Sequence, residues 1–295
     1  MTGGAAAGPD PVGIELADFS TLALVREGPV LHVTLNRPEV RNAMSLAMVR
    51  ELRAVLAQAE MGGRGSDGIR VLVLRGAGGH FCAGGDIKDM AGARGRLAEN
   101  PGAMAETNTA FGELCVAYAN TGLALVTVLQ GTVMGGGFGL ACVSDVALAD
   151  ETVVFRLPET GLGLLPAQVG PFLVERIGYA ETKRLAVTGA KVDAQEALRL
   201  RLVHEVHIDD EALEWALART LRSILACAPG ALAATKALLA KARFTPPAAL
   251  VPEAAQMFSQ AVLGPEGVEG TLAFVQKRRA AWVPAEPAAA EGNAT

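Results

Sequence analysis

Two glycine-rich segments contain the residues of this sequence that are best suited to chemistry. The first runs through Gly84 and Gly85 after the strand-like run at 71–74, and the second is Gly135 to Gly137. Each stands between an apolar run and a segment with helical spacing, which predicts strand, turn and helix. The first N–H groups of a helix lack intrahelical partners, and glycine lets a foreign oxygen approach them. Such a turn can bind an anion or an oxyanion, or it can simply permit close packing.

Several other site chemistries lack their residues. No glycine stands at the third position of G-x-G-x-x-G after Gly135 or Gly137, and no Lys-Ser/Thr pair follows, so neither nucleotide-binding template fits. No G-x-S-x-G occurs, which argues against a serine hydrolase. The four histidines form no metal-ligand spacing, and no metal site is expected.

The motifs and their order resemble the enoyl-CoA hydratase/isomerase (crotonase) family. Its F-x-A-G-x-D signature matches Phe81 to Asp86, its G-G-G-x-x-L signature matches Gly135 to Leu140, and a P-E pair follows at Pro158-Glu159. Asn36 to Met44 is similar to the family's N-R-P-x-x-x-N-A stretch, and Phe274 to Arg279 is similar to its F-x-x-K-R stretch. The ordered set extends over most of the chain and is therefore specific.

The resemblance implies a substrate and a set of site residues. The substrate is an acyl thioester of coenzyme A, whose carbonyl oxygen lies between the backbone N–H groups of Gly85 and Gly136 and is stabilised there as an enolate. Glu159 is the implied general acid/base. No separate cofactor and no metal are implied, since coenzyme A is part of the substrate. The implied coenzyme A contacts are Val40, Ala83, Gly85, Asp86, Ile87, Lys88, Gly136 and Lys277.

One position departs from the best-known hydratases of that family. They carry a second glutamate three residues after the second glycine of G-G-G, where this chain has Gly139. Asp89 and Glu113 are candidate replacements by location alone. With a single carboxylate, Glu159 could still move a proton between two carbons, as in the family's Δ3,Δ2-enoyl-CoA isomerases.

A further segment favours hydration. The run from Leu157 to Phe172 resembles members that hydrate branched glutaconyl-type thioesters, such as methylglutaconyl-CoA or isohexenylglutaconyl-CoA. The prediction is therefore an enoyl-CoA hydratase, with a methylglutaconyl-type substrate as one candidate. The alternatives are a Δ3,Δ2-enoyl-CoA isomerase, a thioesterase or decarboxylase on the same scaffold, and a coenzyme A-binding protein without catalysis.

Composition excludes some partners and predicts a compartment. The formal net charge of −5 argues against a nucleic-acid binder, which needs a clustered basic face. The four cysteines are far apart with no C-x-x-C, so neither a zinc site nor a disulfide framework is indicated, and a cytoplasmic protein is expected. From Leu114 to Ser144 no residue is charged, but polar residues and glycines leave apolar runs too short to span a membrane. No membrane association is expected.

The elements that must position the site follow from local patterns. The sequence predicts a hairpin of Leu22 to Arg26 and Val30 to Asn36, a helix Leu46 to Glu60 capped by Ser45, a strand Ile69 to Leu74, a surface loop Ala91 to Gly102, a helix Ala103 to Ala119, a strand Leu123 to Leu129, and short strands Val146 to Ala149 and Val153 to Leu157. The alternation predicts an α/β fold. The resemblance implies a crotonase-like spiral of repeated β-β-α units.

The C-terminal part differs in character, because its helical patterns contain no strand. Helices are predicted at Ala231 to Ala242, Pro252 to Leu263 and Pro265 to Arg279. The predicted organisation is a disordered tail at 1–19, the spiral core at 20–208, a helical region at 209–282 and a second tail at 283–295. The resemblance implies that the helical region covers substrate or packs between subunits of a homotrimer or hexamer.

Overall fold

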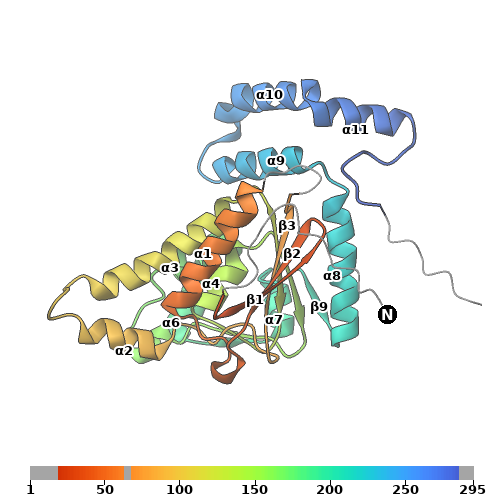
Figure 1. Cartoon of the computed structure of the whole chain (residues 1–295). Coiled ribbons are helices and arrows are strands. Elements are labelled where there is room, and N and C mark those ends of the chain that lie inside the picture. The colour runs from red at the N-terminus through yellow and green to blue at the C-terminus, as the bar shows by residue number, and fades with distance from the viewer. Residues whose placement is uncertain (1–18, 63–67, 286–295) are drawn as a thin grey trace, which may run out of the picture. The chain divides into compact units, whose positions relative to one another are not determined.

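The computed structural model describes residues 19–62 and 68–285, so the predictions for residues 1–18 and 286–295 lie outside the described part. The chain divides into two compact units, Met1–Leu217 and Ala218–Thr295. The division falls inside helix α8 (Asp210–Leu225). Figure 1 shows a mixed α/β first unit and a second unit that consists of helices and connecting loops.

The first unit is built on a six-stranded sheet with the strand order β1-β2-β3-β4-β6-β9. β1 and β2 form an antiparallel hairpin, and all later neighbours pair in parallel. β4 is buried along its whole length, as expected of an apolar run in a parallel sheet with both faces covered. The strands are β1 (Leu22–Glu27), β2 (Val30–Leu35), β3 (Val71–Gly76), β4 (Ala124–Leu129), β6 (Val146–Asp150) and β9 (Glu205–His207).

A second, three-stranded sheet gives the fold its repeat. It contains β5 (Thr132–Met134), β7 (Val154–Arg156) and β8 (Lys191–Val192) in the order β5-β7-β8. After a short turn, β5 follows β4 and β7 follows β6. Each of these two repeats therefore adds one strand to the six-stranded sheet and one to the three-stranded sheet. Isolated parallel bridges, Met44 with Gly85 and Cys82 with Val133, extend this second layer. The chain is therefore an α/β spiral of stacked β-β-α units, as the resemblance implied.

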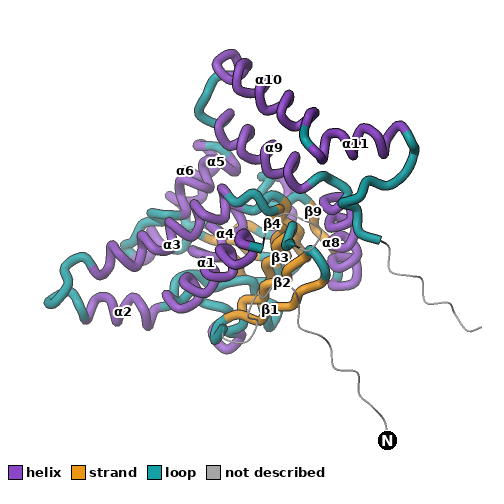
Figure 2. Tube along the Cα trace, turned by 45° about the horizontal axis from the view of Figure 1, so that its top comes forward, coloured by secondary structure: helices purple, strands orange, loops and turns teal. Residues whose placement is uncertain are grey.

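Helices complete each pass of the spiral. α1 packs on α3, α3 on α4, and α4 on α5, and both views show α1, α3 and α4 as neighbours beside the sheet (Figures 1 and 2). The helices of this unit before α8 are α1 (Leu46–Met61), α2 (Ile87–Gly95), α3 (Ala103–Asn120), α4 (Gly136–Val143), α5 (Val169–Ile177), α6 (Tyr179–Thr188) and α7 (Ala194–Arg199), with 3-10 turns η1 (Pro38–Val40) and η2 (Glu159–Leu162).

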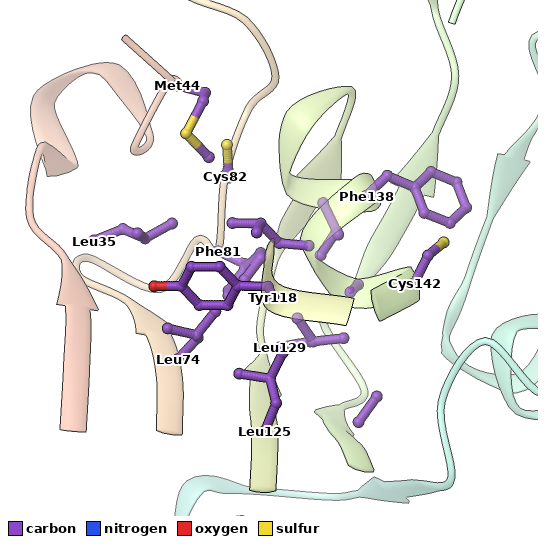
Figure 3. Close-up of a cluster of buried hydrophobic side chains, with 14 of the residues drawn as sticks. Leu35, Met44, Leu74, Phe81, Cys82, Tyr118, Leu125, Leu129, Phe138 and Cys142 are labelled. Carbon is purple, nitrogen blue, oxygen red and sulfur yellow. The ribbon is translucent and has the colours of Figure 1, made fainter. Parts of the chain in front are cut away.

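The core lies between these helices and the sheet. Figure 3 shows part of it, where Leu74, Leu125 and Leu129 of the strands gather with Tyr118 of α3. The Tyr118 hydroxyl is buried but satisfied, because it donates to the Leu52 carbonyl at 2.9 Å. This contact joins α3 to α1 at the level of the core.

Most of the predicted elements are present within a few residues. The predicted hairpin is β1 and β2, and the predicted cap of α1 is confirmed, since the Ser45 side chain accepts a hydrogen bond from the Met48 N–H. The charge-free stretch from Leu114 to Ser144 is divided among the end of α3, β4, β5 and α4. In the described part of the chain, no single helix is long and apolar enough to cross a membrane. One bent pair, α8 with α9 (Pro229–Ala242), meets the requirements of length and composition when the two helices are taken together.

The predicted loop from Ala91 to Gly102 is wrong in its first half. Ala91 to Gly95 belong to α2, which starts when the Asp86 side chain accepts a hydrogen bond from the Lys88 N–H. Ala93 is completely buried, so the packing of this helix outweighs the low helix propensity of Gly92 and Gly95. The sequence of this helix shows no helical repeat of apolar residues, because only one of its residues is buried.

The second unit contains the end of α8 and the helices α9 (Pro229–Ala242), α10 (Pro247–Leu263) and α11 (Pro265–Val275). α10 starts before the predicted Pro252, which lies inside it, and α11 ends before the predicted Arg279. The early end of α11 has a physical cause, since Lys277 adopts a left-handed backbone with φ 53° that cannot continue a helix. Glu266 of α11 caps α9 by accepting from the N–H groups of Gly230 and Ala231 at 2.8 and 2.9 Å.

Candidate active site

The first glycine turn leaves one backbone donor free. Met44 brackets Gly85, since its N–H donates to the Gly84 carbonyl at 2.7 Å and its carbonyl accepts from the Asp86 N–H at 3.0 Å. Within residues 19–62 and 68–285, no acceptor is found for the N–H of Gly85 itself. A β-carbon placed on Gly85 would meet nothing within 4 Å. Gly85 is therefore exposed, and its N–H is not used by another described residue.

The second turn has the same property at the start of α4. Gly135 has φ 45° and ψ −116°, a conformation that glycine adopts readily and other residues avoid. Gly136 is the first residue of α4, where an N–H has no intrahelical partner. Nor does the Gly136 N–H find an acceptor elsewhere among the described residues.

Backbone pairing holds the two turns together. The Cys82 N–H donates to the Thr132 carbonyl, and the Met134 N–H donates to the Cys82 carbonyl, both at 2.9 Å. A β-carbon on Gly135 would lie 3.1 Å from the Gly84 α-carbon and 3.6 Å from the Gly85 nitrogen. With both turns this close, the N–H groups of Gly85 and Gly136 can serve one substrate oxygen.

Glu159 adds a carboxylate to this pair of turns. It opens η2 directly after Pro158, and its Oε1 atom is 3.4 Å from the position that a β-carbon on Gly135 would occupy. Its Oε2 atom is buried and has no hydrogen-bond partner in the described structure. Burial raises the pKa of this carboxyl, because the charged form loses hydration. A raised pKa makes it easier for this carboxyl to hold a proton and return it, which is what a general acid/base must do.

The predicted coenzyme A contacts other than Gly85 and Gly136 divide into four groups. Ala83 and Val40 lie near each other, since the Ala83 N–H donates to the carbonyl of Arg41 at 2.9 Å. Ile87 and Lys88 are exposed on the first turn of α2. Asp86 is instead buried in an ion pair with Arg37, at 2.8 Å. Lys277 is exposed and belongs to the second unit.

Residues 19–62 and 68–285 offer no evident site for metal chemistry. In the part of the chain that the structure describes, no group of three or more His, Cys, Asp or Glu side chains could hold a metal ion. Cys82 lies beside Met44 at the edge of the first turn (Figure 3), but burial raises the pKa of its thiol to about 11. That thiol is therefore protonated and unreactive at neutral pH.

Comparison with known proteins decides the family. A sequence model described as Enoyl-CoA hydratase/isomerase matches residues 26–284. The chain belongs to the enoyl-CoA hydratase/isomerase family. A probable enoyl-CoA hydratase of Rhizobium meliloti (strain 1021) is 32% identical over 266 residues, which cover 89% of this chain and 97% of that protein. The 2,3-dehydroadipyl-CoA hydratase of Escherichia coli (strain K12) is 30% identical, covering 88% of this chain and 97% of its own length.

Solved structures give the same assignment. Pseudomonas aeruginosa AtuE is 55% identical, with a TM-score of 0.85 over 90% of this chain and 100% of that chain. An enoyl-CoA hydratase/isomerase from Marinobacter aquaeolei is 48% identical, with a TM-score of 0.84 over 90% and 99%. The protein is accordingly a crotonase-fold enzyme of the hydratase/isomerase family.

Gly139, the position at which a second glutamate was expected by resemblance to the best-known hydratases, is crowded by other side chains. A β-carbon on Gly139 would lie 3.0 Å from Phe111 Cζ and 3.3 Å from Cys115 Sγ. The same phenyl ring is 3.2 Å from a β-carbon placed on Gly136. Phe111 on α3 therefore packs against the start of α4, and a longer side chain at position 139 has no room while it stays there.

Neither candidate replacement for that glutamate is free to act. The Asp89 carboxylate accepts a hydrogen bond from the Leu46 N–H at 2.5 Å and so helps to cap α1. Glu113 is exposed and forms a surface ion pair with Arg53 at 2.6 Å. Among the carboxylates considered from the sequence, Glu159 is the one that lies beside the glycine turns with an unpaired oxygen.

Sequence reasoning assigned no role in this site to three residues, although Cys82 lies within the first motif. Phe111, Met44 and Cys82 all contact the glycines of the second turn, at positions where a β-carbon on Gly136 or Gly137 would be crowded. Met44 and Cys82 fall inside or next to the matched motifs, so their place in the site could have been inferred. Phe111 has no such signal, because its role depends on how α3 packs on α4.

Proposed function

We propose that the protein is an enoyl-CoA hydratase in which Glu159 is the single acid/base group. The observation that carries this proposal is the buried, unpartnered Glu159 oxygen beside two glycine turns with free N–H groups. A buried carboxylate without a partner is costly for stability, and such groups concentrate at functional sites. The substrate is an acyl thioester of coenzyme A, and no cofactor besides this substrate is needed.

One carboxylate suffices for a balanced hydration. The Gly85 and Gly136 N–H groups bind the thioester oxygen and stabilise the negative charge that develops there. Glu159 takes a proton from water while the water oxygen bonds to the β-carbon, and the π electrons move onto the thioester oxygen. The resulting enolate collapses as its α-carbon takes the proton from Glu159. The carboxylate is regenerated, and one water has been added across the double bond.

The acyl group that we propose is a branched, glutaconyl-type chain. The Leu157 to Phe172 run, which resembles hydratases of such thioesters, begins two residues before Glu159 and places exposed leucines after it, namely Leu162, Leu164 and Leu165. One relative is named for 2,3-dehydroadipyl-CoA, itself a thioester of a dicarboxylic acid. An apolar segment next to the acid/base group suits the hydrocarbon part of such a chain, including a branch.

The second candidate is a Δ3,Δ2-enoyl-CoA isomerase, favoured by Phe111. Its ring occupies the space beside Gly139 where a second carboxylate would otherwise help to hold water. In an isomerase, Glu159 takes a proton from the α-carbon of a 3-enoyl thioester and returns it to the γ-carbon. This reaction needs no water, and the same enolate is stabilised by the same two N–H groups.

We also propose that the second unit forms contacts between subunits of a homotrimer or hexamer. Large apolar side chains on and beside α10 and α11 are exposed in the single chain, including Phe258, Leu263, Phe274 and Val275. Contiguous exposed apolar residues mark interaction surfaces. Lys277, which is exposed, is proposed to contact the phosphates of coenzyme A. Light scattering after size-exclusion chromatography gives the subunit number, and a monomer contradicts this assembly.

The function is tested with three thioesters in deuterated water. Crotonyl-CoA, 3-methylglutaconyl-CoA and a 3-enoyl-CoA are each incubated with the enzyme, and thioester absorbance and deuterium incorporation are followed. Loss of the conjugated absorbance with addition of water supports the hydratase, whereas migration of the double bond without water supports the isomerase. Glu159→Gln is expected to abolish turnover, while Glu113→Gln, a surface carboxylate of the same type, keeps it. Turnover that survives Glu159→Gln contradicts both candidates.

A further inference from the structure

The direction of the Gly85 N–H is set by its pairing with Met44. Met44 uses its own N–H and carbonyl to bond the Gly84 carbonyl and the Asp86 N–H. The Gly84 carbonyl and the Gly85 N–H belong to one trans peptide group, in which the C=O and the N–H point in opposite directions, so the N–H of Gly85 points away from Met44. The segment that ends at Met44 therefore determines where this donor is aimed.

That segment, residues 37–44, is fixed by a buried asparagine. Asn42 is completely buried, and its side-chain amide donates to the carbonyls of Ala77 at 2.9 Å and His80 at 2.7 Å. Its Oδ1 atom accepts from the Arg37 N–H at 2.8 Å. These bonds tie the segment to the loop that leads from β3 into the first glycine turn.

Arg37 joins the same two chain segments through its side chain. Its Nη1 atom donates to the Ala43 carbonyl at 2.7 Å and lies 2.8 Å from Asp86 Oδ2. Ala43 directly precedes Met44, and Asp86 directly follows Gly85. One guanidinium nitrogen thus connects the residues on either side of the Met44–Gly85 bridge.

The Arg37–Asp86 pair is largely shielded from water. The side chains of Arg37 and Asp86 are 20% and 9% exposed, so their attraction is weakly screened. Burial alone would raise the pKa of Asp86, but hydrogen bonds from Arg37 and from the Lys88 N–H outweigh it and lower that pKa. Both oxygens of the Asp86 carboxylate are therefore engaged inside the protein, Oδ2 by Arg37 and Oδ1 by the Lys88 N–H.

We propose that Arg37 is a positioning residue for catalysis: through Asp86 and the Ala43 carbonyl it holds the Met44–Gly85 bridge so that the Gly85 N–H points at the thioester oxygen. This inference rests on the proposed function, because the aim of this N–H matters for turnover if it binds the substrate carbonyl. Asp86 acts together with Arg37, and we assign it to positioning instead of to direct contact with coenzyme A.

The kinetic expectation is a loss of turnover with little loss of binding. Arg37→Met is expected to lower kcat by about 10- to 100-fold with KM within about threefold, because a displaced donor weakens the transition state more than the ground state. Arg37→Lys is expected to recover a large part of kcat, since an ammonium group can donate to both acceptors. Arg53→Met, which removes another arginine–carboxylate pair at 2.6 Å on the surface, should leave kcat unchanged.

A double variant separates positioning from stability. Arg37→Met leaves the buried Asp86 carboxylate without its partner, and the variant could therefore fold poorly. In Arg37→Met/Asp86→Asn the unpaired charge is gone, so folding is expected to recover while kcat stays low. The thermal midpoint of unfolding and kcat are measured on the same preparations.

The absorbance of a bound thioester shows directly how strongly the Gly85 N–H polarises the substrate carbonyl. Cinnamoyl-CoA is an α,β-unsaturated thioester whose absorbance moves to longer wavelength when its carbonyl is polarised. The wild-type enzyme should produce such a shift, Arg37→Met/Asp86→Asn a smaller one, and Arg53→Met the full one. A folded double variant with wild-type kcat and the full shift overturns the inference. If the wild type itself shows neither shift nor turnover on any of the three thioesters, the proposed function has failed and the inference fails with it.

Discussion

The carboxylate of Glu159 lies against Gly135, with Oε1 3.4 Å from the position that a β-carbon on Gly135 would occupy. This contact places the acid/base group at the junction of the two glycine turns, because the same β-carbon position is 3.1 Å from the Gly84 α-carbon. Gly135 therefore has two separate reasons to be glycine. One is its backbone conformation and the other is the space that the turns and Glu159 share.

Gly135→Ala is expected to lower both stability and activity. At φ 45° and ψ −116° a β-carbon strains the backbone, at a cost of about 1 to 3 kcal/mol in the free energy of unfolding. The methyl group also pushes Gly84 and Glu159 apart, which should reduce kcat by about 100-fold. Denaturant unfolding and steady-state kinetics give the two numbers.

Gly92→Ala is the matched control for this substitution. Gly92 lies inside α2 with no positive φ, and a β-carbon there meets nothing within 4 Å. Alanine should stabilise the helix by about 0.5 to 1 kcal/mol without changing kcat. Equal effects of the two substitutions would show that the space around Gly135 is unimportant.

Glu159→Gln is expected to stabilise the protein at neutral pH although it removes activity. The folded pKa of Glu159 is raised by burial, whereas in the unfolded chain it is about 4.3. As pH rises above the unfolded value, the unfolded chain loses this proton more readily, so the wild type loses stability until the folded pKa is passed. Glutamine does not titrate, and its advantage should grow over this window and then stay constant.

Thermal unfolding from pH 4 to pH 8 tests whether stability changes with pH in the expected direction. Glu51→Gln is the comparison, because the opposite direction is expected for it. Burial would raise the pKa of Glu51, but hydrogen bonds from Ser20 and Thr21 lower it. The ionised Glu51 therefore stabilises the fold above its unfolded pKa, and this contribution is lost as pH falls through the folded pKa. Glu51→Gln should cost most stability at neutral pH. A Glu159→Gln advantage that is the same at pH 4 and pH 8 contradicts the assignment.

The sequence predicted those parts of the fold that have local signals. Ser45 before an apolar helical period predicted the start of α1, and the turn of Glu27 to Pro29 predicted the first hairpin. The motif match gave Glu159, but its burial and its contact with Gly135 depend on residues 24 positions apart and could not be read from either segment.

Two features that the sequence did not predict, the helix at residues 91–95 and the position of Phe111, have the same physical cause, which is packing between elements. Residues 91–95 look like a loop because their glycines hide any period, yet the burial of Ala93 and the Asp86 cap make them helical. Phe111 has no motif and reads as one apolar residue of α3. Its position over Gly136 and Gly139 results from packing between α3 and α4, which local patterns do not contain.

Asn42→Ala is expected to destabilise the protein by about 2 to 4 kcal/mol in the free energy of unfolding. The substitution leaves the carbonyls of Ala77 and His80 without their donor in a buried place, and it puts alanine at φ 56°. Asn42→Gly removes the strain but not the lost bonds, so it should recover only part of the stability. Denaturant unfolding measures both.

Asn120→Ala provides the reference for a surface asparagine. Its side chain also donates to a carbonyl, that of Val116 at 2.9 Å, but the contact is exposed and water can replace it. The expected change is within about 0.5 kcal/mol. If Asn42→Ala were as mild as this control, the loop from Arg37 to Met44 would not depend on its buried asparagine.

Gly139→Glu tests whether Phe111 excludes a second carboxylate. Alone, the substitution should destabilise the protein by about 1 to 3 kcal/mol, because its β-carbon would already lie 3.0 Å from Phe111 Cζ. Phe111→Ala removes the ring, so Gly139→Glu/Phe111→Ala should recover part of that loss. The second carboxylate would then be free to hold water at α4, and hydration of crotonyl-CoA should rise about tenfold or more above Phe111→Ala alone.

Gly139→Gln/Phe111→Ala separates the charge from the shape, because glutamine fills the same space without acting as a base. It should match the glutamate variant in stability and show no gain in hydration. Absorbance of the conjugated thioester gives the rates, and thermal unfolding gives the stabilities. If Gly139→Glu alone were as stable as the wild type, Phe111 would not be filling that space, and the absence of a second carboxylate would need another explanation.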